Sequence, residues 1–161
     1  MKKVVIQIHE IEEPMVFVIY EDIAPITSRN FLDLVNKGFY NGLTFHRIIP
    51  NFMIQGGCPN GNGTGGSGKN IKGEFRANGV MNPLGHYKGA LSMARANDFN
   101  SASSQFFICN TDTHFLDGNY AVFGMMISGE KTLDRISGVQ TTENDFPVYP
   151  VIIEKAWVEE E

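Results

Sequence analysis

Between residues 45 and 57 the chain reads Phe-His-Arg-Ile-Ile-Pro-Asn-Phe-Met-Ile-Gln-Gly-Gly, two short apolar runs that meet at a Pro-Asn pair. Successive side chains of a β-strand point to opposite faces. The first run therefore places Arg47 on one face with two apolar neighbours, Phe45 and Ile49. The second run places Met53 and Gln55 together. We interpret this stretch as a pair of strands with polar groups on an apolar face.

A guanidinium among apolar side chains costs free energy unless it has a partner or a function. Arg47 and Gln55 among Phe and Met side chains suit a mostly apolar pocket that binds one polar group. The alternative is an edge strand on which Arg47 lies along the surface, its stem packed on apolar neighbours. The stretch by itself leaves both interpretations open.

The composition is typical of one globular domain spanning residues 1–161, with 42% hydrophobic and 19% charged residues. The 17 glycines indicate tight turns and irregular backbone rather than long helices. A formal net charge of −5 and a terminal run of three glutamates argue against nucleic-acid and anionic-membrane partners. No segment suggests assembly, so we expect a monomer.

Cysteine usage and the N-terminal sequence indicate the compartment. The chain has two cysteines, Cys58 and Cys109, and such sparse usage is typical of reduced thiols in the cytoplasm. The first residues lack the apolar run and cleavage site of a signal peptide, and no stretch is long enough to cross a membrane. We therefore expect a cytoplasmic protein.

Periodicity predicts a mainly β protein. The apolar runs 4–8 and 15–20 form a first hairpin. A helix is expected from Pro25 to the Lys37-Gly38 pair, and a second over 130–136. Further strands or short apolar segments are expected at residues 45–49, 53–57, 90–94, 105–109, 120–126 and 148–158. About eight short strands with glycine-rich connections favour a barrel or a sandwich.

Motifs for other chemistries are weak. Residues 63–70 nearly match a phosphate-binding loop, but Asn70 replaces the required hydroxyl and residues 71–73 do not open a helix, so we favour a structural loop over a nucleotide site. The four histidines have no ligand spacing, so no metal site is expected. No serine elbow or activated cysteine is recognisable. This absence fits a binding module, or an enzyme whose reaction moves no protons.

Several longer motifs, in order, resemble the cyclophilins, the cyclophilin-type peptidyl-prolyl cis–trans isomerases. The residues that carry the resemblance are Phe45 to Pro50, Phe52 to Gly57, Ser104 to Ile108, Phe115 to Gly118 and Val122 to Gly124. The resemblance extends over nearly the whole chain. It implies an all-β fold, a closed eight-stranded antiparallel barrel with an α-helix capping each end. It also implies that proline-containing peptides and folding proteins are partners, and that no cofactor is needed.

Matching positions imply roles for individual residues. Arg47 resembles the catalytic arginine of the family, with Gln55 and Phe107 beside it. The walls of the proline pocket are implied to be Phe52, Met53, Phe107 and Leu116. Gln55 and Gln105 are implied to orient the substrate backbone, and Ala94 and Arg95 to contact the residue before proline.

Three positions depart from well-known eukaryotic cyclophilins and make the pattern more similar to bacterial members. Phe115 stands where those proteins carry Trp, Tyr120 where many carry His, and Arg95 where many carry Asn. We expect Phe115 and Tyr120 still to contact substrate. Loss of the indole N–H implies only weak binding of cyclosporin A, whereas Phe remains a large apolar wall for proline.

Rotation about an X–Pro bond transfers no proton, which agrees with the lack of an acid–base pair. A donor such as Arg47 aimed at the proline nitrogen would bind the twisted transition state better than the planar ground state. The alternative hypothesis is a proline-peptide binding module or holdase in which catalysis is incidental.

Overall fold

The structure is a computed structural model that describes residues 1–160. These residues form eight β-strands and two α-helices. The strands are β1 (Lys2–Ile8), β2 (Met15–Ile19), β3 (Arg47–Ile49), β4 (Met53–Gly56), β5 (Ala90–Met93), β6 (Phe106–Cys109), β7 (Val122–Ser128) and β8 (Ile153–Glu160). The helices are α1 (Pro25–Asn36) and α2 (Glu130–Ser137), and short 3-10 helices cover Arg76–Asn78 and His114–Leu116. No helix within residues 1–160 has the length and apolar character needed to span a membrane.

Local signals predicted most of these elements. Helix α1 begins at Pro25, whose fixed φ suits a first helical position, and Gly38 with φ of 73° follows its end. The last strand begins at Ile153 rather than at Val148 as predicted. Pro150 lies between these positions and has no N–H to donate to a strand ladder.

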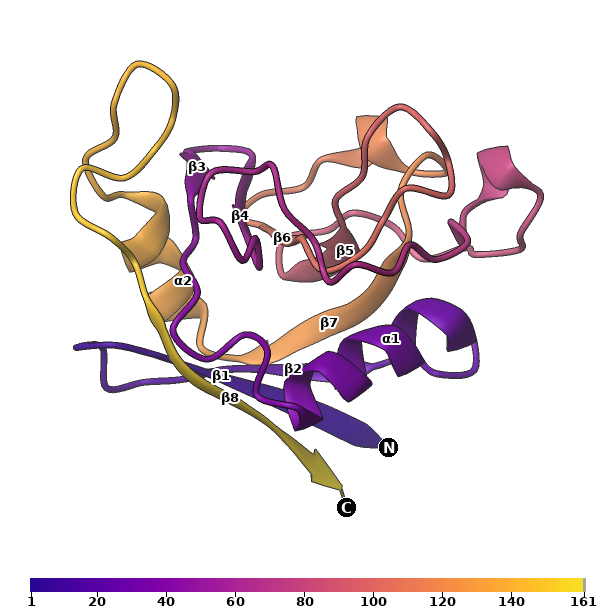
Figure 1. The fold of residues 1–161 in the computed structure, drawn as a ribbon, viewed down its shortest axis with the longest axis horizontal. Helices are drawn as coiled ribbons and strands as arrows, with labels where there is room; N and C mark the ends of the chain where they lie inside the picture. Colours follow the sequence, from indigo (N-terminus) through magenta and orange to yellow (C-terminus); the bar gives the residue numbers. More distant parts are fainter. Residues whose placement is uncertain (161) are drawn as a thin grey trace.

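The strands form one antiparallel sheet in the order β3-β4-β6-β5-β7-β2-β1-β8. The sheet is strongly curled, and α1 and α2 lie at opposite sides of the curl (Figure 1). The prediction of a closed barrel is wrong, because β3 and β8 do not pair. One bridge between Thr44 and Ile152, with backbone hydrogen bonds from Phe45 to Val151 and from Ile153 to Leu43, joins the segment before β3 to the start of β8. The fold is a half-barrel.

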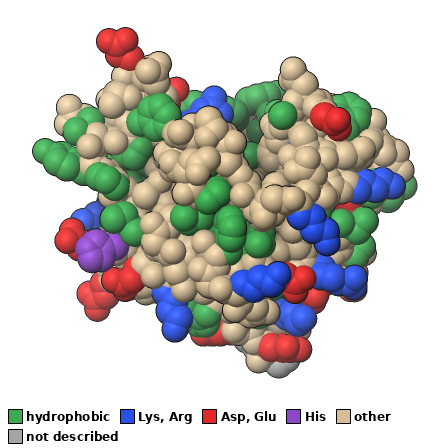
Figure 2. Space-filling model, viewed as in Figure 1, with side chains coloured by type: hydrophobic (Ala, Val, Ile, Leu, Met, Phe, Trp, Pro, Cys, Tyr) green, Lys and Arg blue, Asp and Glu red, His purple; other side chains and the backbone are tan. Residues whose placement is uncertain are grey.

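Groups outside the sheet accept hydrogen bonds from one N–H on each of the two sheet edges. On the β3 edge, the N–H of Ile48 donates to the carbonyl of Asp145 at 2.9 Å. On the β8 edge, the N–H of Ala156 donates to Oδ1 of Asn41 at 3.0 Å. Asp145 belongs to the loop between α2 and β8, which projects from the sheet and carries exposed hydrophobic side chains (Figure 2).

Aromatic side chains dominate the main core between α1 and the sheet. The Phe31 ring of α1 lies 5.2 Å from Tyr40, 5.3 Å from Phe106 and 5.0 Å from Phe123, measured between ring centroids. All four side chains are buried. This cluster fixes α1 against the strands that carry Phe106 and Phe123.

Strand alternation divides the apolar residues of β4 and β6 between two clusters. Ile54, Phe106 and Ile108 enter the main core, whereas Met53 and Phe107 belong to a second, smaller cluster. The predicted pairing of Phe107 with Gln105, and of Met53 with Gln55, on shared faces is therefore consistent with the structure.

The prediction that Phe45 lies on the same strand face as Arg47 and Ile49 is wrong. Phe45 is buried in the main core beside Phe106, whereas Ile49 packs against the second cluster. Strand β3 begins only at Arg47, so regular alternation does not extend back to Phe45.

Replacing Phe106 tests the aromatic core. We expect Phe106→Ala to lower the free energy of unfolding by about 3–5 kcal/mol, because it removes a ring with three buried aromatic neighbours. Chemical denaturation measures this change. Ile127→Ala, at an exposed position of β7, is the control and should change stability by less than about 0.5 kcal/mol. Equal losses in both variants would contradict the assignment of the core.

Candidate active site

A cavity of about 160 Å³ opens on the face that carries the second apolar cluster. It is lined by nine residues: Arg47, Phe52, Met53, Gln55, Ala94, Arg95, Phe107, Leu116 and Tyr120. All nine were predicted as site residues from the sequence. Of the remaining predicted residues, Gln105 lines an adjacent cavity and Phe115 lies at the rim.

Sheet register brings the polar residues together. Arg47 of β3 is directly opposite Gln55 of β4, and Gln55 is in turn opposite Phe107 of β6. Residues opposite one another in antiparallel strands project to the same face. One row across three strands therefore presents a guanidinium, an amide and an aromatic ring to the cavity.

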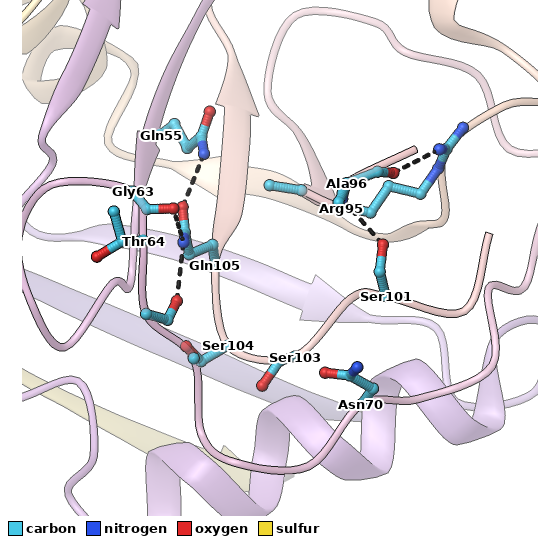
Figure 3. A pocket seen from close by; sticks show the side chains of 13 residues that line it. Gln55, Gly63, Thr64, Asn70, Arg95, Ala96, Ser101, Ser103, Ser104 and Gln105 are labelled. Carbon is cyan, nitrogen blue, oxygen red and sulfur yellow. Dashed lines mark hydrogen bonds between the residues drawn. The ribbon is translucent and has the colours of Figure 1, made fainter. Parts of the chain in front are cut away.

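A chain of hydrogen bonds continues from this row. Arg47 Nη1 donates to Gln55 Oε1 at 3.3 Å, and Gln55 Nε2 donates to Gln105 Oε1 at 2.9 Å. Gln105 Nε2 then donates to two carbonyls of the glycine-rich loop, those of Gly63 and Gly65, each at 2.9 Å (Figure 3). Both N–H groups of the Gln105 amide are thus used by the loop. A substrate that contacts Gln105 would have to do so from the adjacent cavity.

Arg47 is exposed to solvent at the cavity. Among residues 1–160, no carboxylate lies within ion-pair distance of its guanidinium. Its bond to Gln55 is long and uses one of its five N–H groups. The guanidinium therefore has N–H groups that can donate to a ligand.

The adjacent polar cavity has a volume of about 340 Å³. Residues 63–66 and 101–105 supply much of its wall, and Gln55, Ala94 and Arg95 line both cavities (Figure 3). Sequence reasoning missed residues 101–103, which belong to no motif, although it singled out the glycine-rich loop. The loop leads to Ile71, which bridges to Ala102, and not to a helix. It lacks the helix N-terminus of a phosphate-binding loop.

Arg95 is held between the two cavities. Its guanidinium donates to the carbonyls of Asn119 and Ala96, with distances between 2.7 and 3.1 Å. The rings of Phe75, Phe99 and Tyr120 lie 5.0, 5.0 and 4.6 Å from its Cζ atom. Cation–π contacts and carbonyl acceptors can stabilise a guanidinium in this way. Phe75, Phe99 and Asn119 had no signal in the sequence that would link them to Arg95.

The apolar wall has a buried part and an exposed part. Phe107 is only 5% exposed, and the Tyr120 ring meets it edge-on at 5.8 Å between centroids. Phe115 is 72% exposed, and its ring lies 5.6 Å from that of Phe52. Phe52 and Phe115 form an outer apolar rim, whereas Phe107 forms the deeper surface of the cavity.

The comparisons with known proteins agree with this geometry. The family model described as cyclophilin-type peptidyl-prolyl cis-trans isomerase/CLD matches residues 3–158. The chain belongs to this family. It has the activity of the family, peptidyl-prolyl cis–trans isomerisation.

Relatives of this cyclophilin occur in bacteria and in fungi. It is 50% identical over 113 residues to peptidyl-prolyl cis-trans isomerase B of Bacillus subtilis, covering 70% of this chain and 76% of the relative. It is 45% identical over 148 residues to peptidyl-prolyl cis-trans isomerase-like 1 of Gibberella zeae, covering 91% of this chain and 90% of the relative. A crystal structure of a Cryptosporidium parvum cyclophilin in the presence of the dipeptide Ala-Pro superimposes with a TM-score of 0.89 at 30% identity, over 99% of each chain.

His46 lies next to Arg47 and is only 4% exposed. Burial lowers the pKa of His46, and the positive charge of Arg47 lowers this pKa further. Its Nδ1 atom has no hydrogen-bond partner in the structure. The folded protein therefore favours the neutral imidazole beside the cationic site.

This shift predicts a pH dependence of stability. The folded pKa of His46 lies below its ordinary value of 6.5. The stabilising contribution is therefore complete above about pH 6.5 and is lost as the pH falls below that value toward the folded pKa. We expect the melting temperature to fall less between pH 7.5 and pH 5 in His46→Gln than in the wild type. Parallel melting curves for the two proteins would contradict this assignment.

Proposed function

We propose that this cyclophilin accelerates X–Pro rotation by a hydrogen bond from Arg47 to the proline nitrogen, while the apolar cavity holds the proline ring. The observation that supports it is an exposed guanidinium, without a carboxylate partner in residues 1–160, at the mouth of a cavity walled by Phe and Met side chains. The Ala-Pro dipeptide named for the related crystal structure is a ligand of the chemistry that this cavity would take.

The physics of the amide explains how one donor can contribute to catalysis. Resonance stiffens the C–N bond and gives a rotation barrier of about 18–20 kcal/mol. When the bond twists, resonance is lost and the proline nitrogen gains a lone pair that can accept a hydrogen bond. Arg47 would thus bind the transition state better than either planar isomer, which is the condition for catalysis. A roughly 10⁵-fold acceleration requires about 7 kcal/mol.

The surroundings of Arg47 would strengthen this interaction. Bound proline would exclude water from the space between Phe107 and Met53, and electrostatic interactions are stronger where the dielectric constant is lower. A preorganised charged donor can contribute several kcal/mol in such a site. The hydrogen-bonded chain through Gln55 and Gln105 would hold the guanidinium in place while its other N–H groups face the substrate.

We further propose that the substrates are proline-containing segments of folding or unfolded proteins, and that the chain acts as a cytoplasmic monomer. Both cysteines are buried free thiols, which supports a reducing compartment. The competing hypothesis, a holdase with incidental catalysis, is supported by the apolar rim of Phe52 and Phe115. The charge of Arg47 favours the enzyme, because binding apolar peptides does not require it.

Substitution of Arg47 tests the mechanism. We expect Arg47→Ala to lower kcat/KM for a proline peptide by about 10²–10³, because the donor to the proline nitrogen is lost. Exchange NMR of the cis and trans peptide signals gives the rate, and peptide titration gives the affinity. Arg29→Ala, at an exposed position of α1, should retain wild-type turnover.

Two outcomes of the same measurement would contradict the proposal. Turnover in Arg47→Ala equal to that of Arg29→Ala would remove Arg47 from the mechanism. Peptide binding to the wild-type protein without enhanced exchange would select the holdase instead.

Cyclosporin A tests the outer rim. We expect the wild-type protein to be inhibited only weakly, because Phe115 offers no N–H to a carbonyl of the inhibitor. Phe115→Trp restores an indole donor at an exposed position and should tighten inhibition by about tenfold, the value of roughly one added hydrogen bond. The inhibition constant of the two proteins is compared with the same peptide substrate. Phe115→Tyr is the control, because it adds a hydroxyl donor at a different position of the ring, and equal tightening by Tyr and Trp would refute a specific role for the indole.

A further inference from the structure

A buried histidine lies directly behind the wall of the proline cavity. The imidazole of His86 is stacked on the Phe107 ring, with an interplanar angle of 9° and 5.8 Å between centroids. The Tyr120 ring meets the same imidazole edge-on at 6.5 Å. His86 is 0% exposed and does not line the cavity. It therefore packs against two residues of the cavity wall without lining the cavity itself.

Hydrogen bonds fix this imidazole at both nitrogens. Nδ1 lies 2.8 Å from Asp117 Oδ1, and Nε2 lies 3.0 Å from the hydroxyl of Ser92. An ionised carboxylate can only accept, so Nδ1 carries the hydrogen, and Nε2 accepts from Ser92. Ser92 is paired with Phe107 in the β5–β6 register. The ring that backs Phe107 is thus anchored partly to the neighbouring strand.

The ionisation states agree with this arrangement. Burial lowers the pKa of His86, although the hydrogen bond and the charge of Asp117 act in the opposite direction. Partial burial would raise the pKa of Asp117, but the hydrogen bonds it accepts from His86 and His114 lower it overall. A neutral imidazole donating to a carboxylate is the consistent assignment.

Asp117 also forms hydrogen bonds near the turn that supplies another wall of the cavity. It follows the 3-10 helix His114–Leu116, and Leu116 lines the cavity. Its Oδ1 atom accepts the backbone N–H of His86 at 2.7 Å, and its Oδ2 atom lies 2.8 Å from His114 Nδ1. One carboxylate therefore links the Leu116 turn to the ring behind Phe107.

We propose that His86 and Asp117 are a positioning pair that sets the distance between the Phe107 and Leu116 walls of the proline cavity. The proposal rests on the assignment of this cavity to proline, but it is independent of the hydrogen bond assigned to Arg47. A proline ring held between these walls is aligned with the guanidinium only if the walls keep their separation. Displacements of about 1 Å can cost up to 10²-fold in rate.

The simpler alternative is that the pair only stabilises the fold, as buried polar networks commonly do. A purely structural role would lower the melting temperature without changing the properties of the folded site. A positioning role would change kcat and the motion of the Phe107 ring at temperatures where the protein remains folded.

The test compares three variants of the full chain. Asp117→Ala removes the link, and we expect kcat for a proline peptide to fall about tenfold with a smaller change in KM, and the Phe107 ring to flip faster in NMR spectra of the free protein. Asp117→Asn keeps an oxygen that can accept from His86, and it should recover most of the lost kcat. His9→Ala removes an exposed histidine that also has carboxylate partners but lines neither cavity, and it should leave kcat within about twofold.

The outcomes are separable from those of the Arg47 experiment, because ring motion is measured without substrate. Wild-type kcat and ring motion in folded Asp117→Ala would overturn the proposal, as would an equal loss of kcat in the control variant His9→Ala. If Asp117→Ala does not fold, His86→Phe keeps a ring against Phe107 while removing both of its hydrogen bonds. We expect the same loss of kcat in that variant, and full activity would again overturn the proposal.

Discussion

Antiparallel pairing of β4 with β3 on one side and β6 on the other places Gln55 between Arg47 and Phe107. This register governs the site, because a shift of one residue in either pair would turn the polar groups toward the core. The same alternation sends Ile54 and Phe106 into the main core. Core packing therefore enforces the register that assembles the functional face. In these strands, the same packing of side chains in the core determines both the stability and the geometry of the site.

Two arginines at the cavity are used in different ways. Arg47 makes one long hydrogen bond and keeps donors available at the surface. Arg95 is immobilised by carbonyls and by the faces of three aromatic rings. Neither is neutralised by a carboxylate within the part of the chain that the structure describes. The site thus stays cationic in a chain whose net charge is −5, which suits it to the electron-rich atoms of a peptide.

The walls of the cavity depend on residues that never meet the substrate. Phe107 is backed by His86, Arg95 rests on Phe75 and Phe99, which do not line the cavity, and Gln105 is bound by the glycine-rich loop. These three side chains are thereby held by a second set of contacts. A rigid cavity of this kind can align a proline ring with a donor without the loss of much side-chain entropy on binding.

Much of the fold followed from local sequence. The Pro25 start and Gly38 end of α1 use backbone preferences that are properties of single residues, and the strand faces of Gln105 and Phe107 follow from a period of two. The site residues were predicted mainly through the family resemblance, because Phe52, Leu116 and Tyr120 are far apart in the chain and share no local pattern. Phe45 shows where periodicity fails: the strand had not yet begun there.

By itself, the sequence determined the β-rich class and the two helices, and its resemblance to the cyclophilins identified the residues that line the candidate cavity. Only the tertiary structure decided whether the sheet closes, since this depends on whether β3 and β8, which are far apart in the chain, pair with each other. It also decided that Gln105 binds the glycine-rich loop and that His86 lies behind Phe107. These contacts join segments separated by tens of residues, and hydrogen-bonding groups that meet only after folding leave no periodic signal in the chain.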